Sequence, residues 1–155
     1  MSVIYEPKGK AREYSPLALN LYNGCDHRCF YCYVPNMKKQ YDKSYVHEKV
    51  ICRENIIETL KKEAPRLINK NQVLLSFAGD PYCLANDKYD LTGQALEILY
   101  QNKIPVAILT KGGKRTYIDI NVIKKFGESI KVGCTLTFDN DKHSIEYEPG
   151  AAPTS

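Results

Sequence analysis

Apolar residues recur along this chain in two patterns, as short apolar runs and as stripes three or four positions apart. The short runs cover residues 17–22, 73–78, 105–110 and 131–138. Their length and composition are typical of strands in a buried sheet. The stripes cover residues 53–64, 90–102 and 116–127, where the spacing places the apolar side chains on one helical face. The pattern predicts four strands that alternate with three helices.

The residues between these segments support the same element order. Pro65 follows the first helical stripe and should end it, and Gly127 stands where a glycine commonly follows a helix. An order of strand, helix, strand implies parallel strands joined by right-handed crossovers. The fold class is therefore α/β. The spacing fits either an open doubly wound sheet or part of a β/α barrel, and it does not separate the two.

The last stretch of the sequence differs from the rest. After the fourth strand the chain reads "DNDKHSIEYEPGAAPTS", whose small residues and glycine favour irregular structure. We expect one domain over residues 1–140 and an irregular tail over 141–155. The fourth strand would be an uncovered edge, which natural sheets avoid. The chain therefore resembles the first part of a larger fold.

Composition and charge narrow the class of protein only slightly. The 155 residues are 43% hydrophobic and 26% charged, with a formal net charge of +4, which suits one globular domain and is only mildly basic. We expect a cytoplasmic protein with no membrane contact, since no apolar run resembles a signal peptide or a membrane span. Neither of the glycine-rich nucleotide-binding patterns is present.

Three of the six cysteines lie within eight positions, in the stretch "NGCDHRCFYCYVPN". Cys25, Cys29 and Cys32 form a C-x3-C-x2-C pattern, and cysteine clusters in cytosolic proteins usually bind metal. Zinc would need a fourth protein ligand, for which His27, Cys52 or Cys83 are the candidates. An iron–sulfur cluster with one open iron needs only three thiolates. Three buried free thiols are the remaining alternative.

At this point the sequence resembles a known family. The cysteine pattern, with Tyr31 just before its last member, resembles the signature of the radical SAM superfamily. The stretches "YEPKGKAREYSPLALNLYNGCDHRCFYCYVPN", "SFAGDPY", "ILTKGG" and "EPGAAPTS" are similar to its spore photoproduct lyase-like branch. The resemblance implies a partial (β/α) barrel of parallel strands, of which this chain would supply about four βα units.

The resemblance also implies a chemistry. Cys25, Cys29 and Cys32 would bind a [4Fe-4S] cluster whose open iron takes S-adenosylmethionine. One electron would cleave that cofactor to a 5′-deoxyadenosyl radical, which abstracts hydrogen from a substrate that the sequence does not identify. An electron donor such as a flavodoxin or a ferredoxin would be the partner. The residues expected to bind the cofactor are Tyr31, Gly79, Asp80, Lys111, Thr135 and Thr137, and no catalytic residue is assigned.

Two features depart from the family pattern. Spore photoproduct lyases carry a hydrogen-donor cysteine where this chain has Phe77, and the superfamily core has six βα units rather than about four. Two alternatives to an active enzyme follow. One is a metal-stabilised module without catalysis, with nucleic acid as a weakly supported partner through basic pairs such as Lys61 and Lys62. The other is an inactive fragment of a radical SAM enzyme.

Overall fold

A five-stranded sheet forms the centre of the computed structural model, which describes residues 2–67 and 70–154. Its strands follow the order β1-β2-β5-β6-β7. Their bounds are Ile4–Tyr5 for β1, Leu17–Leu19 for β2, Val73–Leu75 for β5, Val106–Thr110 for β6 and Ile130–Cys134 for β7. β1 is antiparallel to β2, and all the other pairs are parallel. The four predicted parallel strands are therefore present, with one antiparallel strand added at the edge.

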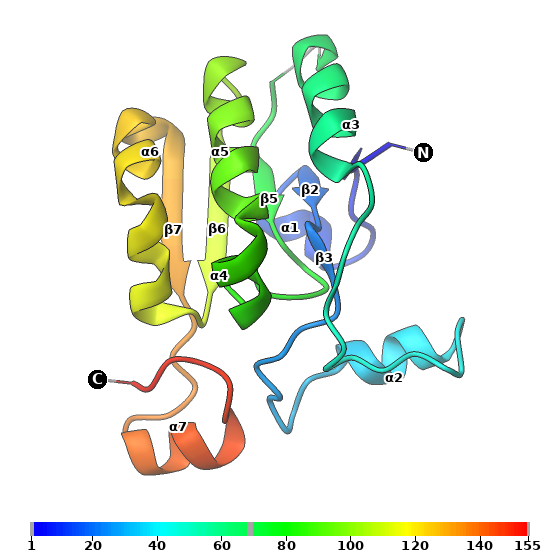
Figure 1. Cartoon of the computed structure of the whole chain (residues 1–155), viewed down its shortest axis with the longest axis vertical. Helices are drawn as coiled ribbons and strands as arrows, with labels where there is room; N and C mark the ends of the chain where they lie inside the picture. Colours follow the sequence, from blue (N-terminus) through cyan, green and yellow to red (C-terminus); the bar gives the residue numbers. More distant parts are fainter. Residues whose placement is uncertain (1, 68–69, 155) are drawn as a thin grey trace.

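Three helices cover one face of this sheet (Figure 1). They are α3 (Ile56–Glu63), α5 (Leu91–Gln101) and α6 (Ile120–Lys125), and α5 packs between the other two. The other helices are α1 (Ala11–Tyr14), α2 (Val34–Lys39), α4 (Leu84–Tyr89) and α7 (Asp141–Tyr147). The 3-10 turns are η1 (Ala64–Arg66), η2 (Gly113–Asp119) and η3 (Gly127–Ser129). A second, small sheet consists of β3 (Tyr22–Asn23) paired with β4 (Ile51–Cys52).

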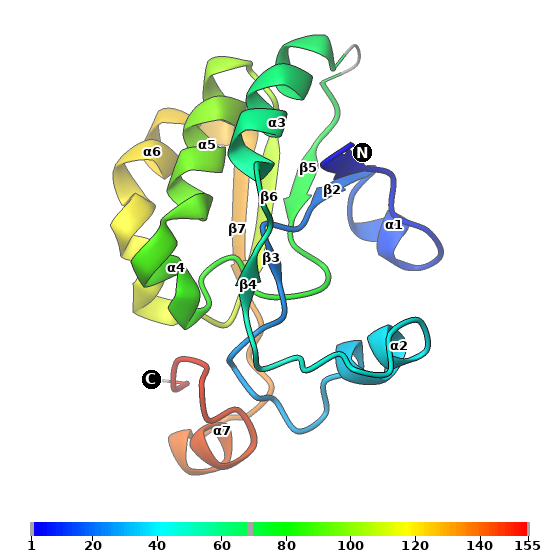
Figure 2. The ribbon, with the colours of Figure 1, turned by 45° about the vertical axis from the view of Figure 1, so that its right-hand side comes forward.

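The parallel strands β2, β5, β6 and β7 lie side by side in the order in which they occur along the chain. Right-handed crossovers between strands in sequential order place every connecting helix on the same face. A doubly wound sheet reverses direction and has helices on both faces, so this arrangement is consistent with a partial β/α fold. Figure 2 shows α3, α5 and α6 together on one side and α1 on the other.

The hydrophobic core lies between the sheet and these helices. Leu96 and Leu99 of α5, Leu60 of α3 and Val106 of β6 are fully buried there. Along β6 the exposure alternates: Ile108 is 2% exposed, whereas the next residue, Leu109, is 42% exposed on the opposite face. One face of the sheet is therefore packed, and the other is open and available to line a pocket.

Two predicted strands are shorter than expected because Asn20 interrupts their pairing. Its side-chain oxygen accepts hydrogen bonds from the backbone N–H groups of Phe77 (2.9 Å) and Ala78 (3.1 Å). The predicted strand 17–22 is therefore divided into β2 and β3, and the strand predicted over 73–78 ends at Leu75. The last predicted strand, 131–138, likewise ends at Cys134.

Two of the predicted helices differ from the structure in their N-terminal parts. Helix α3 begins at Ile56 rather than residue 53, and the 116–127 segment is 3-10 helix before it becomes α6.

Residues 141–147 form helix α7, contrary to the irregular tail expected there. The side chain of Asn140 caps this helix by accepting from the N–H of His143 at 3.0 Å. In the described part of the chain, each helix is too short or too polar to cross a bilayer.

Candidate functional site

The three clustered cysteines lie on the loop between β3 and α2. Gly24 leads into this loop with φ of +101°, and a Cβ there would lie 2.6 Å from the carbonyl oxygen of His47. Only glycine fits this position. The N–H of Cys25 then donates to that same His47 carbonyl at 2.8 Å, and the N–H of Cys32 donates to the Cys29 carbonyl at 3.0 Å. The segment 43–50 therefore supports the loop from one side.

The cysteine loop faces a pocket of about 450 Å³ at the carboxyl ends of β5 and β6. All three thiol-bearing residues line this pocket, together with Tyr31, Gly79, Asp80, Lys111 and Thr135. Every residue predicted for the site is thus at the pocket except Thr137. That residue lines a neighbouring hollow, and its hydroxyl lies 3.0 Å from the hydroxyl of Tyr31. Chain segments far apart in the sequence therefore meet at one cavity.

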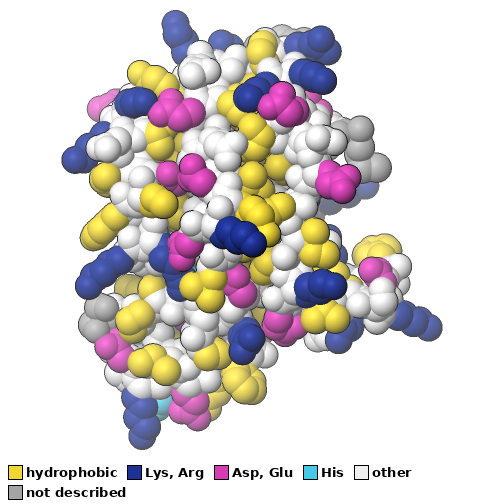
Figure 3. All heavy atoms as spheres, viewed as in Figure 1, with side chains coloured by type: hydrophobic (Ala, Val, Ile, Leu, Met, Phe, Trp, Pro, Cys, Tyr) yellow, Lys and Arg dark blue, Asp and Glu magenta, His cyan; other side chains and the backbone are white. Residues whose placement is uncertain are grey.

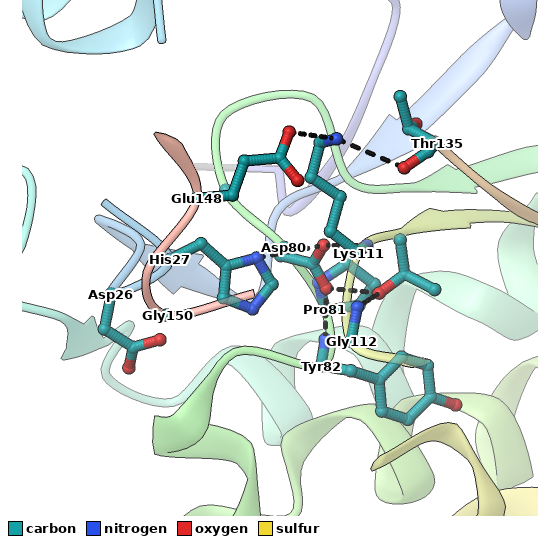
Figure 4. A network of polar contacts seen from close by, with 12 residues as sticks. Asp26, His27, Asp80, Pro81, Tyr82, Lys111, Gly112, Thr135, Glu148 and Gly150 are labelled. Atoms are coloured by element: carbon teal, nitrogen blue, oxygen red, sulfur yellow. Dashed lines mark hydrogen bonds and ion pairs between the residues drawn. The ribbon is translucent and has the colours of Figure 1, made fainter. Parts of the chain in front are cut away.

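Asp80 is a buried carboxylate held mainly by protein donors. Its Oδ1 accepts from the N–H of Tyr82 at 2.8 Å and from the hydroxyl of Thr110 at 2.6 Å, and its Oδ2 accepts from the N–H of Lys111 at 2.7 Å (Figure 4). His27 Nδ1 lies 3.6 Å from Oδ2. A carboxylate has about four acceptor positions, so these three hydrogen bonds leave one on Oδ2, the oxygen that His27 approaches.

Gly79 lies where the loop after β5 approaches the cysteine loop. A Cβ on this residue would be 2.7 Å from the carbonyl oxygen of Gly24 and 3.9 Å from the Cβ of Cys25. The glycine is explained by this close approach between two backbones. A ligand in the pocket would also meet bare backbone at this point.

Lys111 follows β6 and reaches the C-terminal segment. Its Nζ lies 2.7 Å from Glu148 Oε1 and 3.1 Å from the carbonyl of Thr135 (Figure 4). It also lies 2.7 Å from the hydroxyl of Thr137. The same ammonium lies 5.7 Å from the centre of the Tyr31 ring, within the range of a cation–π contact. Lys111 thus joins several of the predicted residues, and its charge already has a carboxylate partner.

A sequence model of the radical SAM superfamily matches residues 19–146. The chain belongs to the radical SAM superfamily. Membership indicates an enzyme and implies, in general, a [4Fe-4S] cluster and S-adenosylmethionine. The match spans the cysteine loop, the ends of β5 and β6, and most of α7, so most of the residues that line the pocket lie within the family domain, and Lys10, Ala11 and Tyr14 precede it.

Two uncharacterized relatives are longer than this chain. It is 30% identical over 131 residues to the uncharacterized protein MJ0683 of Methanocaldococcus jannaschii, covering 84% of this chain and 48% of that protein. It is 30% identical over 98 residues to the uncharacterized protein Rv2578c of Mycobacterium tuberculosis, covering 61% of this chain and 29% of that protein. The chain therefore spans at most about half the length of these relatives. No solved structure matches it significantly.

The donors at the pocket include three thiols, which is the donor type that an iron–sulfur cluster uses. Among the described residues, no three His, Cys, Asp or Glu side chains are grouped so that they could hold one metal ion. Tetrahedral zinc needs four donors around one point. Of its candidate fourth ligands, His27 lines the pocket, whereas Cys52 and Cys83 do not. A four-iron cluster spreads its thiolates over a wider cage. Three unpaired thiols facing one cavity suit that larger group.

Burial raises the pKa of two thiols of the loop, Cys25 and Cys29. Desolvation raises the pKa of Cys25 well above its usual range. It also raises the pKa of Cys29 to about 11, with the Glu148 carboxylate adding to the effect. Neutral thiols are therefore favoured without a metal, and a bound cation would reverse this by deprotonating them.

Three residues near the pocket were missed by the sequence reasoning. His47 supports the cysteine loop, and its Nε2 lies 3.7 Å from the Cys32 sulfur. His27 was considered only as a zinc ligand, and it is buried with Nε2 lacking a hydrogen-bond partner. Glu148 is 4% exposed and pairs with Lys111. Glu148 lies in the stretch "EPGAAPTS", which is part of the resemblance to the family. That resemblance could have identified Glu148 as a candidate.

Proposed function

We propose that this chain binds a [4Fe-4S] cluster through Cys25, Cys29 and Cys32 and cleaves S-adenosylmethionine reductively. When bound, such a cluster supplies the electron that converts the cofactor to methionine and a 5′-deoxyadenosyl radical. The observation that carries the proposal is the shared pocket: the three thiols face one cavity at the carboxyl ends of parallel strands, where ligands of open α/β sheets commonly bind.

The pocket also offers complementary partners for an amino-acid cofactor. Lys111 would attract the methionine carboxylate, and the remaining acceptor position of Asp80 would take the ammonium. The exposed ring of Tyr31 and the neighbouring Thr135 would contact the nucleoside. The open, largely apolar face of the sheet around Leu74 and Leu109 would exclude water from the reacting bond.

Anaerobic reconstitution with ferrous iron and sulfide tests the proposal, followed by dithionite, S-adenosylmethionine and measurement of 5′-deoxyadenosine. We expect about four irons and four sulfides per chain. Replacing Cys25, Cys29 or Cys32 by alanine should abolish iron uptake, whereas Cys134→Ala, at an exposed thiol, should retain it. Bound zinc without inorganic sulfide would contradict the proposal.

The branch of the superfamily and the electron donor are proposed from the resemblance alone, and no step after radical formation is assigned. Phe77 lies at the pocket and its ring contacts Tyr14, and a phenyl ring cannot donate hydrogen as a thiol does. We therefore propose a member similar to the spore photoproduct lyase-like branch without assigning it the lyase step. A flavodoxin or ferredoxin remains the proposed electron donor, and the cytoplasm the proposed location.

Nucleic acid is the less favoured partner. On the face shown in Figure 3, Lys and Arg side chains alternate with Asp and Glu side chains rather than gathering in one area. A nucleic-acid surface usually concentrates positive charge on one face. The mixed charge on this face does not favour a nucleic-acid-binding module.

A further inference from the structure

We propose that the segment 147–152 is a clamp that holds the cysteine loop and Lys111 together, with Gly150 and Glu148 as its positioning residues. The inference rests on the proposed function, because it concerns how the cluster-binding loop is held. The segment begins at the last residue of α7 and runs between the cysteine loop and the loop after β6. It supports the cysteine loop in addition to the segment that contains His47 and the N–H groups of Leu84 and Ala85, which donate to the Asp26 carboxylate.

The clamp bonds to the backbone on both sides of Cys29. The carbonyl of Tyr147 accepts from the N–H of Phe30 at 2.9 Å, and the N–H of Gly150 donates to the carbonyl of His27 at 2.9 Å. The rings of Phe30 and Tyr147 also meet edge to face, with centroids 6.0 Å apart. These contacts fix the backbone on which the middle cysteine of the motif is carried.

Gly150 allows this approach because it has no side chain. A Cβ at this position would overlap the carbonyl oxygen of Asp26, lie 2.8 Å from His27 Cα and lie 3.0 Å from the Asp26 carbonyl carbon. All three atoms belong to the backbone of the cysteine loop, so no side-chain rotation can relieve the overlap. A methyl group at residue 150 must move the loop, the clamp, or both.

The other half of the clamp forms hydrogen bonds and an ion pair with the loop after β6. The N–H of Ala152 donates to the Lys111 carbonyl at 2.8 Å, and the Arg115 guanidinium donates to the Gly150 carbonyl at 2.8 Å. Glu148 pairs with the Lys111 ammonium at 2.7 Å, with both side chains largely buried. The cluster-binding loop and the proposed carboxylate anchor are therefore connected through one short segment (Figure 4).

Amide hydrogen exchange on the metal-free chain tests the clamp, together with iron uptake. In Gly150→Ala we expect exchange at the Phe30 amide, whose acceptor lies in the clamp, to rise about tenfold or more. Exchange within α5 should stay unchanged, and iron bound per chain after reconstitution should fall severalfold. Gly133→Ala is the matched control, because a Cβ there meets its nearest atom at 3.5 Å. It should match the unsubstituted chain in both measurements.

A second variant keeps the test decisive if Gly150→Ala does not fold. Arg115→Ala removes both guanidinium hydrogen bonds to the Gly150 carbonyl without a steric clash, and we expect exchange at Phe30 to rise about fivefold. Unchanged exchange at Phe30 in the folded variant would overturn the clamp. If the unsubstituted chain takes up no cluster, the proposed function fails instead, while the exchange measurement still decides the clamp.

Discussion

The hydroxyl of Thr110 donates a 2.6 Å hydrogen bond to the carboxylate of Asp80. This contact joins the end of β6 to the loop after β5, and both side chains are buried. The Thr110 hydroxyl also accepts from the N–H of Gly112 at 2.8 Å. The Thr110 hydroxyl therefore provides a hydrogen-bond partner both for the Asp80 carboxylate and for the N–H of Gly112, at the edge of the pocket.

The first prediction concerns this hydroxyl. Thr110→Val keeps the shape but leaves a buried carboxylate oxygen and a buried N–H with one partner fewer, so we expect a loss of about 2 kcal/mol in the free energy of unfolding. Urea denaturation measures it. Thr116→Val is the control, because it removes a hydroxyl whose hydrogen bond is exposed, and it should cost no more than about 0.5 kcal/mol. Equal losses in the two variants would contradict the role given to Thr110.

The second prediction concerns the close approach of Gly79 to the cysteine loop. Gly79→Ala would place a Cβ 2.7 Å from the Gly24 carbonyl oxygen, which must displace one of the two loops. We expect iron uptake to fall severalfold, measured as iron per chain after anaerobic reconstitution. Retention of full iron uptake would show that the two loops can separate without cost to the cluster site.

The third prediction concerns pH. Burial raises the pKa of the Asp119 carboxyl from 3.8 to about 6, so the folded chain holds a proton that the unfolded chain has released between these values. Stability should therefore fall as pH rises through this window, by on the order of 2 kcal/mol in total. Chemical denaturation from pH 4 to 7 measures the slope. Asp119→Asn, which carries no titrating group there, should lose this contribution to the slope.

The sequence predicted the parts of the fold that depend on local pattern. The apolar runs around Leu74 and Ile108 became adjacent parallel strands, and the stripe containing Leu96 became the central helix. The ends of the strands predicted over 17–22 and 73–78 were wrong because they depend on Asn20, whose side chain accepts hydrogen bonds from a segment 57 residues away. Such a contact leaves no trace in local periodicity.

The sequence also predicted only part of the candidate site. The spacing of the cysteines marked the loop, and the structure brings those thiols to one pocket with Asp80 and Lys111. The pairing of Lys111 with Glu148 could not be predicted, because the two residues are 37 positions apart and the tail containing Glu148 was expected to be irregular. Helix α7 directs that tail back onto Lys111 at the edge of the pocket, which only the three-dimensional fold reveals.

The last prediction separates the two roles of Lys111. Lys111→Met leaves Glu148 buried beside an apolar side chain, and we expect a loss of about 2 kcal/mol in the free energy of unfolding. The double variant Lys111→Met, Glu148→Met removes both charges and should recover most of that stability, since an apolar pair of similar volume is commonly tolerated.

Binding of S-adenosylmethionine should not recover with stability. If Lys111 anchors the cofactor carboxylate, both variants should bind it about tenfold or more weakly, because a charge-assisted hydrogen bond is lost in each. Equilibrium dialysis on the cluster-loaded protein measures the affinity. Lys125→Met, at an exposed lysine paired with Glu97, is the control and should bind normally. A double variant that regains both stability and affinity would limit Lys111 to a structural role as the partner of Glu148.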